Sequence, residues 1–267
     1  MLEPSLVAGH GILDRRGRLV AAVLGGAAGV GVLVVLVLLL VPRPNGGTLL
    51  VPPSTPVPRW VPPADVPPSA APSGPNGIAG LPDPAWLART AERTGIPQPA
   101  LAAYAGAALN LAQVKPACRI SWNLLAGIGR VESDHGRHRG SSIGPDGAAS
   151  PPIYGRALNG DGVAFIPDSD GGAIDGDAHA DRAAGPMQFI PQTWRNWRID
   201  GSGDGREDPQ NVDDAVLAAA RYLCRASTAL DTEAGWRRAV TSYNDATTYI
   251  DAVARAAEGY RAAAASR

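Results

Sequence analysis

The sequence predicts an all-α, mainly helical domain with long loops, preceded by one transmembrane helix and a proline-rich stalk. Apolar residues recur at spacings of three and four from residue 84 onward, which is the period of an amphipathic helix. A long uncharged apolar run lies near the N-terminus, and prolines cluster between this run and the helical part. These three observations divide the chain into an anchor, a spacer and a folded domain.

Residues 19–41 contain no charged side chain and are long enough to cross a hydrocarbon core of about 30 Å as a helix. Three arginines lie within residues 15–18, before the apolar run, and only Arg43 lies close after it. Because positive charges favour the cytoplasmic side of a membrane helix, we expect residues 1–18 in the cytoplasm and the C-terminal domain outside. A cleaved signal peptide is the alternative. The run is longer than a typical signal core and lacks an obvious cleavage site, which favours an uncleaved, single-pass anchor in the cell membrane.

Residues 42–83 are rich in proline and almost free of charge. Such a composition favours extended polyproline II structure and cannot build a core. We therefore expect a linker that separates the anchor from a domain at residues 84–267.

The domain should consist of helices joined by loops. In residues 120–132, Leu124, Ile128 and Val131 fall on one helical face, and the segment shows no alternation of period two. The helices expected from the same spacing are 85–94, 99–113, 120–132, 191–197, 212–227 and 235–265. Residues 140–182 are rich in Gly, Asp, Pro and Ser, and a loop of this length is either functional, for example as the wall of a cleft, or disordered.

Composition excludes some functions. The formal net charge is −1, so the chain lacks the net positive charge that favours binding to nucleic acid. It also contains no P-loop or Rossmann fingerprint. Its two cysteines, Cys118 and Cys224, most simply form one disulfide in a domain outside the membrane.

Glu132 is the strongest candidate for catalysis. It stands at the end of the apolar segment 120–131, before a polar loop. A carboxyl group half sheltered by apolar neighbours has a raised pKa and can hold a proton near neutral pH. That property is required of a general acid.

Residues 185–191 read Gly-Pro-Met-Gln-Phe-Ile-Pro and precede a short aromatic helix. This motif resembles that of the lytic murein transglycosylases of the membrane-bound B type, and the resemblance runs from about residue 84 to 260. It implies a lysozyme-like domain that acts on peptidoglycan. This sequence differs from better-known members in its long Gly- and Asp-rich loop and in Pro186-Met187 beside Gln188, where others carry an aromatic residue.

The resemblance also implies roles for individual residues. Residues 129–136, GRVESDHG, match the family pattern around a single catalytic glutamate, which assigns Glu132. Gln188 and the pair Tyr243-Asn244 match residues that face the cleft, so we expect them to bind substrate. Tyr and Asn side chains can donate and accept hydrogen bonds with a sugar amide or hydroxyl.

Residues 200–206, DGSGDGR, place oxygen ligands at alternate positions with a glycine sixth, as in an EF-hand calcium loop. The usual closing glutamate is missing, since position twelve is Asn211. The family has a longer loop closed by an aspartate, and Asp214 stands at that place. The resemblance thus implies a structural Ca²⁺ site, although a Gly-rich acidic turn without an ion is the alternative. Its ligands would be Asp200, Ser202, Asp204, the Arg206 carbonyl and Asp214.

The implied reaction cleaves the β-1,4 bond between N-acetylmuramic acid and N-acetylglucosamine and leaves a 1,6-anhydro end, with no cofactor needed for the chemistry. Two other functions agree with the same residues. A hydrolytic muramidase would use water as the nucleophile, and a non-catalytic peptidoglycan-binding module would serve as a scaffold for cell-wall machinery.

Overall fold

The computed structural model describes residues 56–70 and 77–266, all within one of the two units into which the chain divides, residues 32–267. The expected cytoplasmic segment, the anchor at 19–41 and the first part of the linker lie outside the described residues. In the described part of the chain, no helix is long and apolar enough to cross a membrane.

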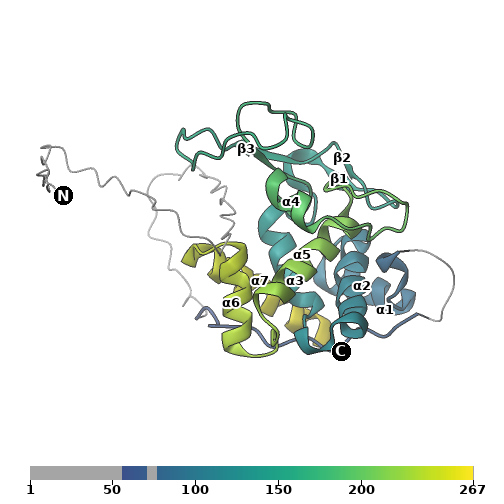
Figure 1. Cartoon of the computed structure of the whole chain (residues 1–267). Helices are drawn as coiled ribbons and strands as arrows, with labels where there is room; N and C mark the ends of the chain where they lie inside the picture. Colours follow the sequence, from purple (N-terminus) through teal and green to yellow (C-terminus); the bar gives the residue numbers. More distant parts are fainter. Residues whose placement is uncertain (1–55, 71–76, 267) are drawn as a thin grey trace, which may run out of the picture. The chain divides into compact units, whose positions relative to one another are not determined.

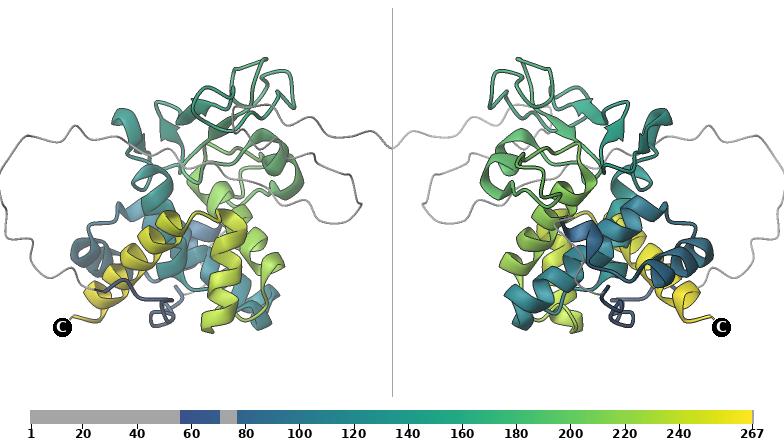
Figure 2. Two further views of the ribbon diagram at one scale, coloured as in Figure 1. Left: turned by 90° about the vertical axis from the view of Figure 1, so that its left-hand side faces the viewer. Right: turned by 90° about the vertical axis from the view of Figure 1, so that its right-hand side faces the viewer.

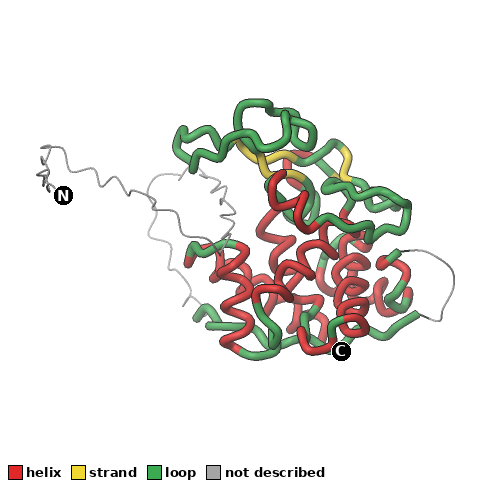
Figure 3. Tube along the Cα trace, viewed as in Figure 1, coloured by secondary structure: helices red, strands yellow, loops and turns green. Residues whose placement is uncertain are grey.

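The expected mainly helical fold is confirmed, and helices form the lower part of Figure 1 and are drawn in red in Figure 3. The α-helices are α1 Pro84–Thr94, α2 Gln98–Val114, α3 Trp122–Ser133, α4 Pro191–Trp197, α5 Val212–Ala226, α6 Glu233–Tyr243 and α7 Thr247–Ala265. Three 3₁₀ turns accompany them, η1 Ile78–Gly80, η2 Pro116–Cys118 and η3 His138–Gly140.

Local sequence explains where α1 begins and ends. The Asp83 side chain accepts a hydrogen bond from the backbone N–H of Trp86 at 2.7 Å, and Pro84 occupies the first helical position. Gly95 ends the helix with a positive φ of 68°, a conformation that costs glycine little. Start and stop signals of this kind are readable from the sequence alone.

The single helix expected over 235–265 is wrong, because the structure has two helices there. The Asn244 side chain accepts a hydrogen bond from the backbone N–H of Ala246 at 3.0 Å. This local bond competes with helical hydrogen bonding. The chain therefore turns after α6 and begins α7 in a new direction.

Helix α2 is the central helix of the core, and most of its residues are buried. It packs against α5, while α3 packs most extensively against α7. At this second contact, a Cβ atom on Gly127 would lie 3.0 Å from both the Ala257 Cβ and the Val253 carbonyl oxygen. Glycine at this position therefore lets α3 and α7 approach closely.

The expected disulfide is present. Cys118 in η2 is bonded to Cys224 in α5, and their Cα atoms lie 5.4 Å apart. It closes a loop with a sequence separation of 106 and thereby links the end of α2 to α5.

Residues 140–182, expected to be one long loop, belong to a layer at one end of the helices that contains short strands, visible in Figures 1 and 2. Two antiparallel pairs organise it, β1 Ser142–Ile143 with β2 Ala149–Ser150, and β3 Tyr154–Ala157 with β4 Arg182–Ala184. Between β3 and β4, Asp168 accepts hydrogen bonds from the backbone N–H groups of residues 170, 171 and 172. Aspartate side chains thus satisfy backbone donors that have no strand partner.

Residues 56–70, which the sequence analysis assigned to the linker, pack on the helical domain. Val61 is buried in the core. Asn123 accepts a hydrogen bond from the backbone N–H of Ala64 and donates one to the Pro62 carbonyl. The packed unit therefore begins before residue 84, because α3 presents side-chain partners for the backbone of an extended segment.

Candidate active site

Glu132 lies in the last turn of α3. The helix stops directly after it, because Asp134 and His135 both adopt positive φ values, 52° and 59°. The backbone N–H of Asp134 donates to the Arg130 carbonyl, and that of His135 donates to the Gly129 carbonyl at 3.0 Å. The carboxylate of Asp134 forms ion pairs with Arg130 and Arg137. Backbone hydrogen bonds and ion pairs therefore both stabilise the end of the helix.

The Glu132 carboxyl group is half-buried, and the Tyr249 hydroxyl donates a hydrogen bond to its Oε1 at 2.6 Å. Burial raises the pKa of Glu132 to about 8, and the Tyr249 bond offsets part of this rise. The pKa of Tyr249 is raised well above its usual value by burial and by the negative charge of Glu132. At neutral pH the pair therefore consists of a protonated acid and a phenol that remains a donor.

Ser133 connects the end of α3 to the Gly-Pro-Met-Gln turn at residues 185–188. Its hydroxyl donates to the Pro186 carbonyl at 2.6 Å and accepts from the backbone N–H of Gly136 at 2.8 Å. Ser133 is buried. The two motifs quoted from the sequence, far apart along the chain, are therefore held together next to Glu132.

Tyr243 holds the same turn from α6. Its hydroxyl donates to the Met187 carbonyl at 2.8 Å, and its side chain is 2% exposed. Gln188 has a positive φ of 50° and donates its amide to the Gly185 carbonyl at 2.9 Å. Met187 is fully buried, which explains why an apolar side chain stands there.

Asn244 is also buried, and it bonds the backbone at the break between α6 and α7. The break places Tyr249 in the first turn of α7, where its hydroxyl reaches Glu132. The structure thus brings Gln188 and Tyr243 together through the Gly-Pro-Met-Gln turn. Asn244 lies at the helix break.

Sequence reasoning missed Tyr249 and a buried hydrogen-bonded chain around His135. The Nδ1 atom of His135 lies 3.1 Å from the Tyr104 hydroxyl, and its Nε2 lies 2.7 Å from the Tyr260 hydroxyl. Burial and the charges of Arg137 and Arg130 lower the pKa of His135 to about 3, so the ring is neutral. The one sequence signal was proximity, because His135 lies inside the segment that contains Glu132.

Glycine at position 129 also belongs to this arrangement. A Cβ atom there would overlap the Tyr104 hydroxyl. The glycine of the GRVESDHG segment therefore makes room for the phenol that contacts His135.

The expected calcium loop is closed by hydrogen bonds. Asp214 accepts backbone N–H bonds at Oδ1 from Gly201 and Ser202 and at Oδ2 from Asp208. Asp200 accepts from the N–H groups of residues 203 and 205. Gly203 and Gly205 have φ values of 78° and 85°, which only glycine adopts at low cost.

The residues of this loop fit a hard cation by their chemistry. All expected ligand atoms are oxygens, and each carboxylate retains lone pairs beyond those used by N–H donors. Burial raises the pKa of Asp214, and the negative charge of Asp200 adds a smaller rise. Neither carboxylate forms an ion pair with a basic side chain in the part of the chain that the structure describes.

A second acidic group lies between β3 and β4. One oxygen each of Asp168, Asp170 and Asp181 lie within 4.8 Å of one another. Their oxygens accept hydrogen bonds from their own loop, for example both Asp181 oxygens from Ser169. These aspartates therefore serve as hydrogen-bond acceptors for donors of their own loop.

Comparison with known proteins gives one family and one solved structure. No curated protein matches the chain. The Escherichia coli lytic transglycosylase Slt35 in complex with bulgecin A is similar at 16% identity with a TM-score of 0.41, covering 73% of this chain and 81% of that chain. Residues 180–241, which hold Gln188, the loop of Asp200 and Tyr222, match the family model of the transglycosylase SLT domain.

Proposed function

We propose that the domain is a lytic transglycosylase that cleaves the β-1,4 bond between N-acetylmuramic acid and N-acetylglucosamine in peptidoglycan. The observation that carries the proposal is Glu132, a half-buried acid with a raised pKa, hydrogen-bonded to Tyr249 at the end of α3. The match of residues 180–241 to the transglycosylase SLT domain supports the same reaction class.

In the first step, Glu132 acts as general acid. It gives its proton to the glycosidic oxygen as the bond from that oxygen to the anomeric carbon breaks. The Tyr249 hydroxyl, already donating to Oε1, stabilises the carboxylate that forms. Because Oε1 accepts from Tyr249, the proton to be transferred is assigned to Oε2.

In the second step, the Glu132 carboxylate acts as base. It takes a proton from the C6 hydroxyl of the muramic residue, and the oxygen of that hydroxyl bonds to the anomeric carbon. This closes the 1,6-anhydro ring and returns Glu132 to its protonated form. One carboxyl group suffices for both steps, which agrees with the engagement of Asp134, the nearest carboxylate along the chain, by Arg130 and Arg137.

The proposal extends to the residues around Glu132. Gln188, Tyr243 and Asn244 are assigned to the sugar-binding region, with Tyr243 acting through the Met187 carbonyl on the shape of the turn. All three are nearly buried, so any direct contact with sugar uses a small exposed edge. Ser133 and Tyr249 join them as residues that position the acid and the turn.

The proposal places the domain outside the membrane, held by residues 19–41. The arginines before the uncharged segment support this orientation. The Cys118–Cys224 disulfide supports it independently, because such bonds persist mainly in oxidising compartments.

A structural Ca²⁺ is part of the proposal and has no role in bond cleavage. Asp200, Ser202, Asp204, the Arg206 carbonyl and Asp214 would hold it. When bound, the ion would neutralise the carboxylates and brace the loop against the start of α5. In the sequence, only the short helix α4 separates the Gly-Pro-Met-Gln turn from the start of this loop at Asp200.

The test is the chemistry of the products. The full chain is incubated with purified peptidoglycan, and soluble fragments are identified by mass spectrometry, in parallel with Glu132→Gln. Gln keeps the shape and an acceptor for Tyr249 but has no acidic proton. Glu258→Gln serves as the control, because Glu258 pairs with Arg261 within α7.

Anhydro-muropeptides from the wild type and the control, and none from Glu132→Gln, are the expected result. Reducing muramic ends would identify a hydrolase with the same acid. Binding without any Glu132-dependent product would identify a non-catalytic peptidoglycan-binding module.

A further inference from the structure

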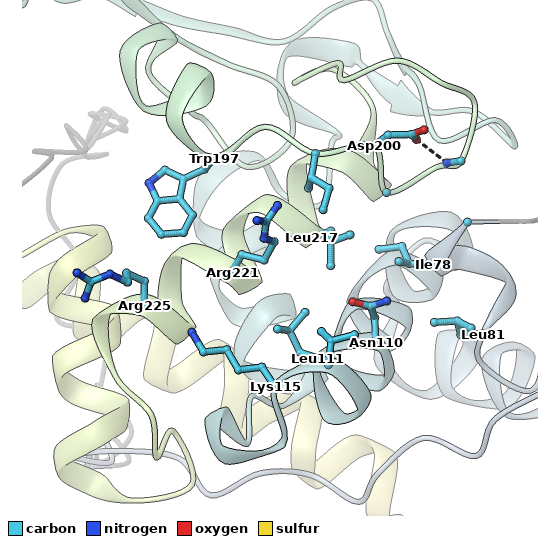
Figure 4. A pocket seen from close by; sticks show the side chains of 15 residues that line it. Ile78, Leu81, Asn110, Leu111, Lys115, Trp197, Asp200, Leu217, Arg221 and Arg225 are labelled. Atoms are coloured by element: carbon cyan, nitrogen blue, oxygen red, sulfur yellow. Dashed lines mark hydrogen bonds between the residues drawn. The ribbon is translucent and has the colours of Figure 1, made fainter.

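A pocket of about 680 Å³ lies between α2 and α5, and Figure 4 shows it from close by. Its wall comes from the C-terminal part of α2, one face of α5, the chain from Trp197 to Gly203, and η1. Neither Glu132 nor Tyr249 lines it. Its volume is in the range of about 300–1,000 Å³ that small-molecule sites occupy.

One part of the wall is aliphatic. The residues that form it come from η1, α2, α5 and the chain between α4 and α5. They are Ile78, Leu81, Leu111, Val114, Ile199 and Leu217. Val114 is 69% exposed, so apolar surface is open to a ligand here. A ligand with small apolar groups would remove this surface from water.

The other part of the wall is basic. Lys115, Arg221 and Arg225 all line the pocket. Lys115 donates to the Cys224 carbonyl at 3.0 Å, which holds its ammonium in place without neutralising it. Arg221 and Arg225 are exposed, and neither forms an ion pair with any described residue.

The one acidic residue in the wall does not compensate these charges. Asp200 turns its carboxylate into its own loop, where it accepts a hydrogen bond from the N–H group of Gly203 (dashed in Figure 4). It also accepts hydrogen bonds from the N–H group of Gly205 and from the Ser202 hydroxyl. The pocket therefore combines an aliphatic wall with three cations, and none of the three forms an ion pair within the described part of the chain.

We propose that this pocket binds the short acidic peptide that peptidoglycan carries on its muramic residues, a proposal that rests on the proposed function. The peptide's carboxylates would lie on Lys115, Arg221 and Arg225, and its alanine methyl groups on the aliphatic wall. A phosphodiester polymer would leave the aliphatic wall unused. Arg221 and Arg225 are offset by about 6 Å along α5, a spread that suits several carboxylates better than a single lipid phosphate.

The pocket would add a second contact between the enzyme and the polymer that it cleaves. A second contact with one polymer raises the effective concentration of the other site. Loss of the pocket should therefore raise KM for peptide-bearing peptidoglycan and leave KM unchanged for glycan strands stripped of their peptides.

The experiment is calorimetric titration of the full chain with synthetic alanyl-γ-glutamyl-diaminopimelate. The double variant Arg221→Gln/Arg225→Gln should weaken binding by about tenfold or more, as expected for the loss of charge-assisted hydrogen bonds. The matched control is Arg89→Gln/Arg255→Gln, which removes the same charge from two exposed arginines on α1 and α7. This control should bind like the wild type.

Several results would overturn the proposal. They are no binding of the peptide by the wild type, equal binding of a fully amidated peptide, equal weakening in the control, and binding of phosphatidylglycerol vesicles in preference to the peptide. Glu132→Gln separates this proposal from the function. It should bind the peptide normally, so arginine-dependent binding without glycan cleavage would keep the pocket and reject the transglycosylase.

Discussion

The Tyr249 hydroxyl donates a 2.6 Å hydrogen bond to Oε1 of Glu132 and joins the start of α7 to the end of α3. A second bond joins the turn directly after α3 to α7, between His135 Nε2 and the Tyr260 hydroxyl at 2.7 Å. Gly127 lets α3 and α7 approach closely at Val253 and Ala257. The acid is therefore held by a helix pair, which is more rigid than a loop would be.

Turnover should fall as pH rises through about 8. Burial raises the pKa of Glu132 to about 8 from an ordinary 4.5, so the acid form is present below this pH and lost above it. The pH profile of kcat/KM reports this group in the free enzyme. A profile that stays flat from pH 6 to about 10 would contradict the assignment.

The same pKa shift affects stability, and its sign follows from proton binding. The folded state holds a proton on Glu132 that the unfolded state releases above about pH 4.5, so its contribution is lost as pH rises through about 8. Glu132→Gln does not titrate. Its urea midpoint relative to wild type should therefore rise between pH 5 and about 9, while that of Glu258→Gln shows no such rise.

Tyr249→Phe should reduce kcat by about tenfold to a hundredfold with little change in KM, because it removes one hydrogen bond to the carboxylate formed in the reaction. The pKa of Glu132 should rise further, since the Tyr249 bond lowers it. The alkaline limb of the rate profile would then move to higher pH.

Tyr222→Phe is the control for that variant. It removes a hydroxyl bond of the same length, 2.6 Å, to the Ser242 carbonyl. If both variants changed the pH profile equally, the specific role of Tyr249 would be rejected.

Ser133→Ala should destabilise the protein by about 1–3 kcal/mol, because it leaves the Pro186 carbonyl and the Gly136 N–H without their partner. Activity should fall as well, since the Gly-Pro-Met-Gln turn loses its link to α3. Urea unfolding and steady-state kinetics measure the two effects. Ser242→Ala loses one bond within α6, to Ala239, and should change both far less.

Calcium should raise the thermal unfolding midpoint of the full chain, because a ligand that binds only the folded state stabilises it by mass action. Asp204→Asn removes the negative charge of one expected ligand and should reduce the response. Asp208→Asn alters an exposed acid of the same loop that is not an expected ligand. Identical midpoints in excess calcium and in chelator would reject the site.

The sequence by itself determined most helices, the catalytic candidate and the paired cysteines. Helical spacing, caps such as Asp83 and turn residues such as Gly95 act over a few residues, so they are readable without a structure. Glu132 and Gln188 became candidates because each lies in a short motif that matches the family that the sequence resembles. The error at 235–265 arose because one side chain, Asn244, redirects the backbone.

Only the tertiary structure decided what surrounds Glu132. Tyr249 lies 117 residues from it, and Pro186 lies 53 residues from Ser133. Such contacts depend on how whole helices pack, and periodicity carries no information about them. The packing of residues 56–70 on the helical domain and the basic pocket between α2 and α5 could not be predicted for the same reason, since each is formed by segments distant in sequence.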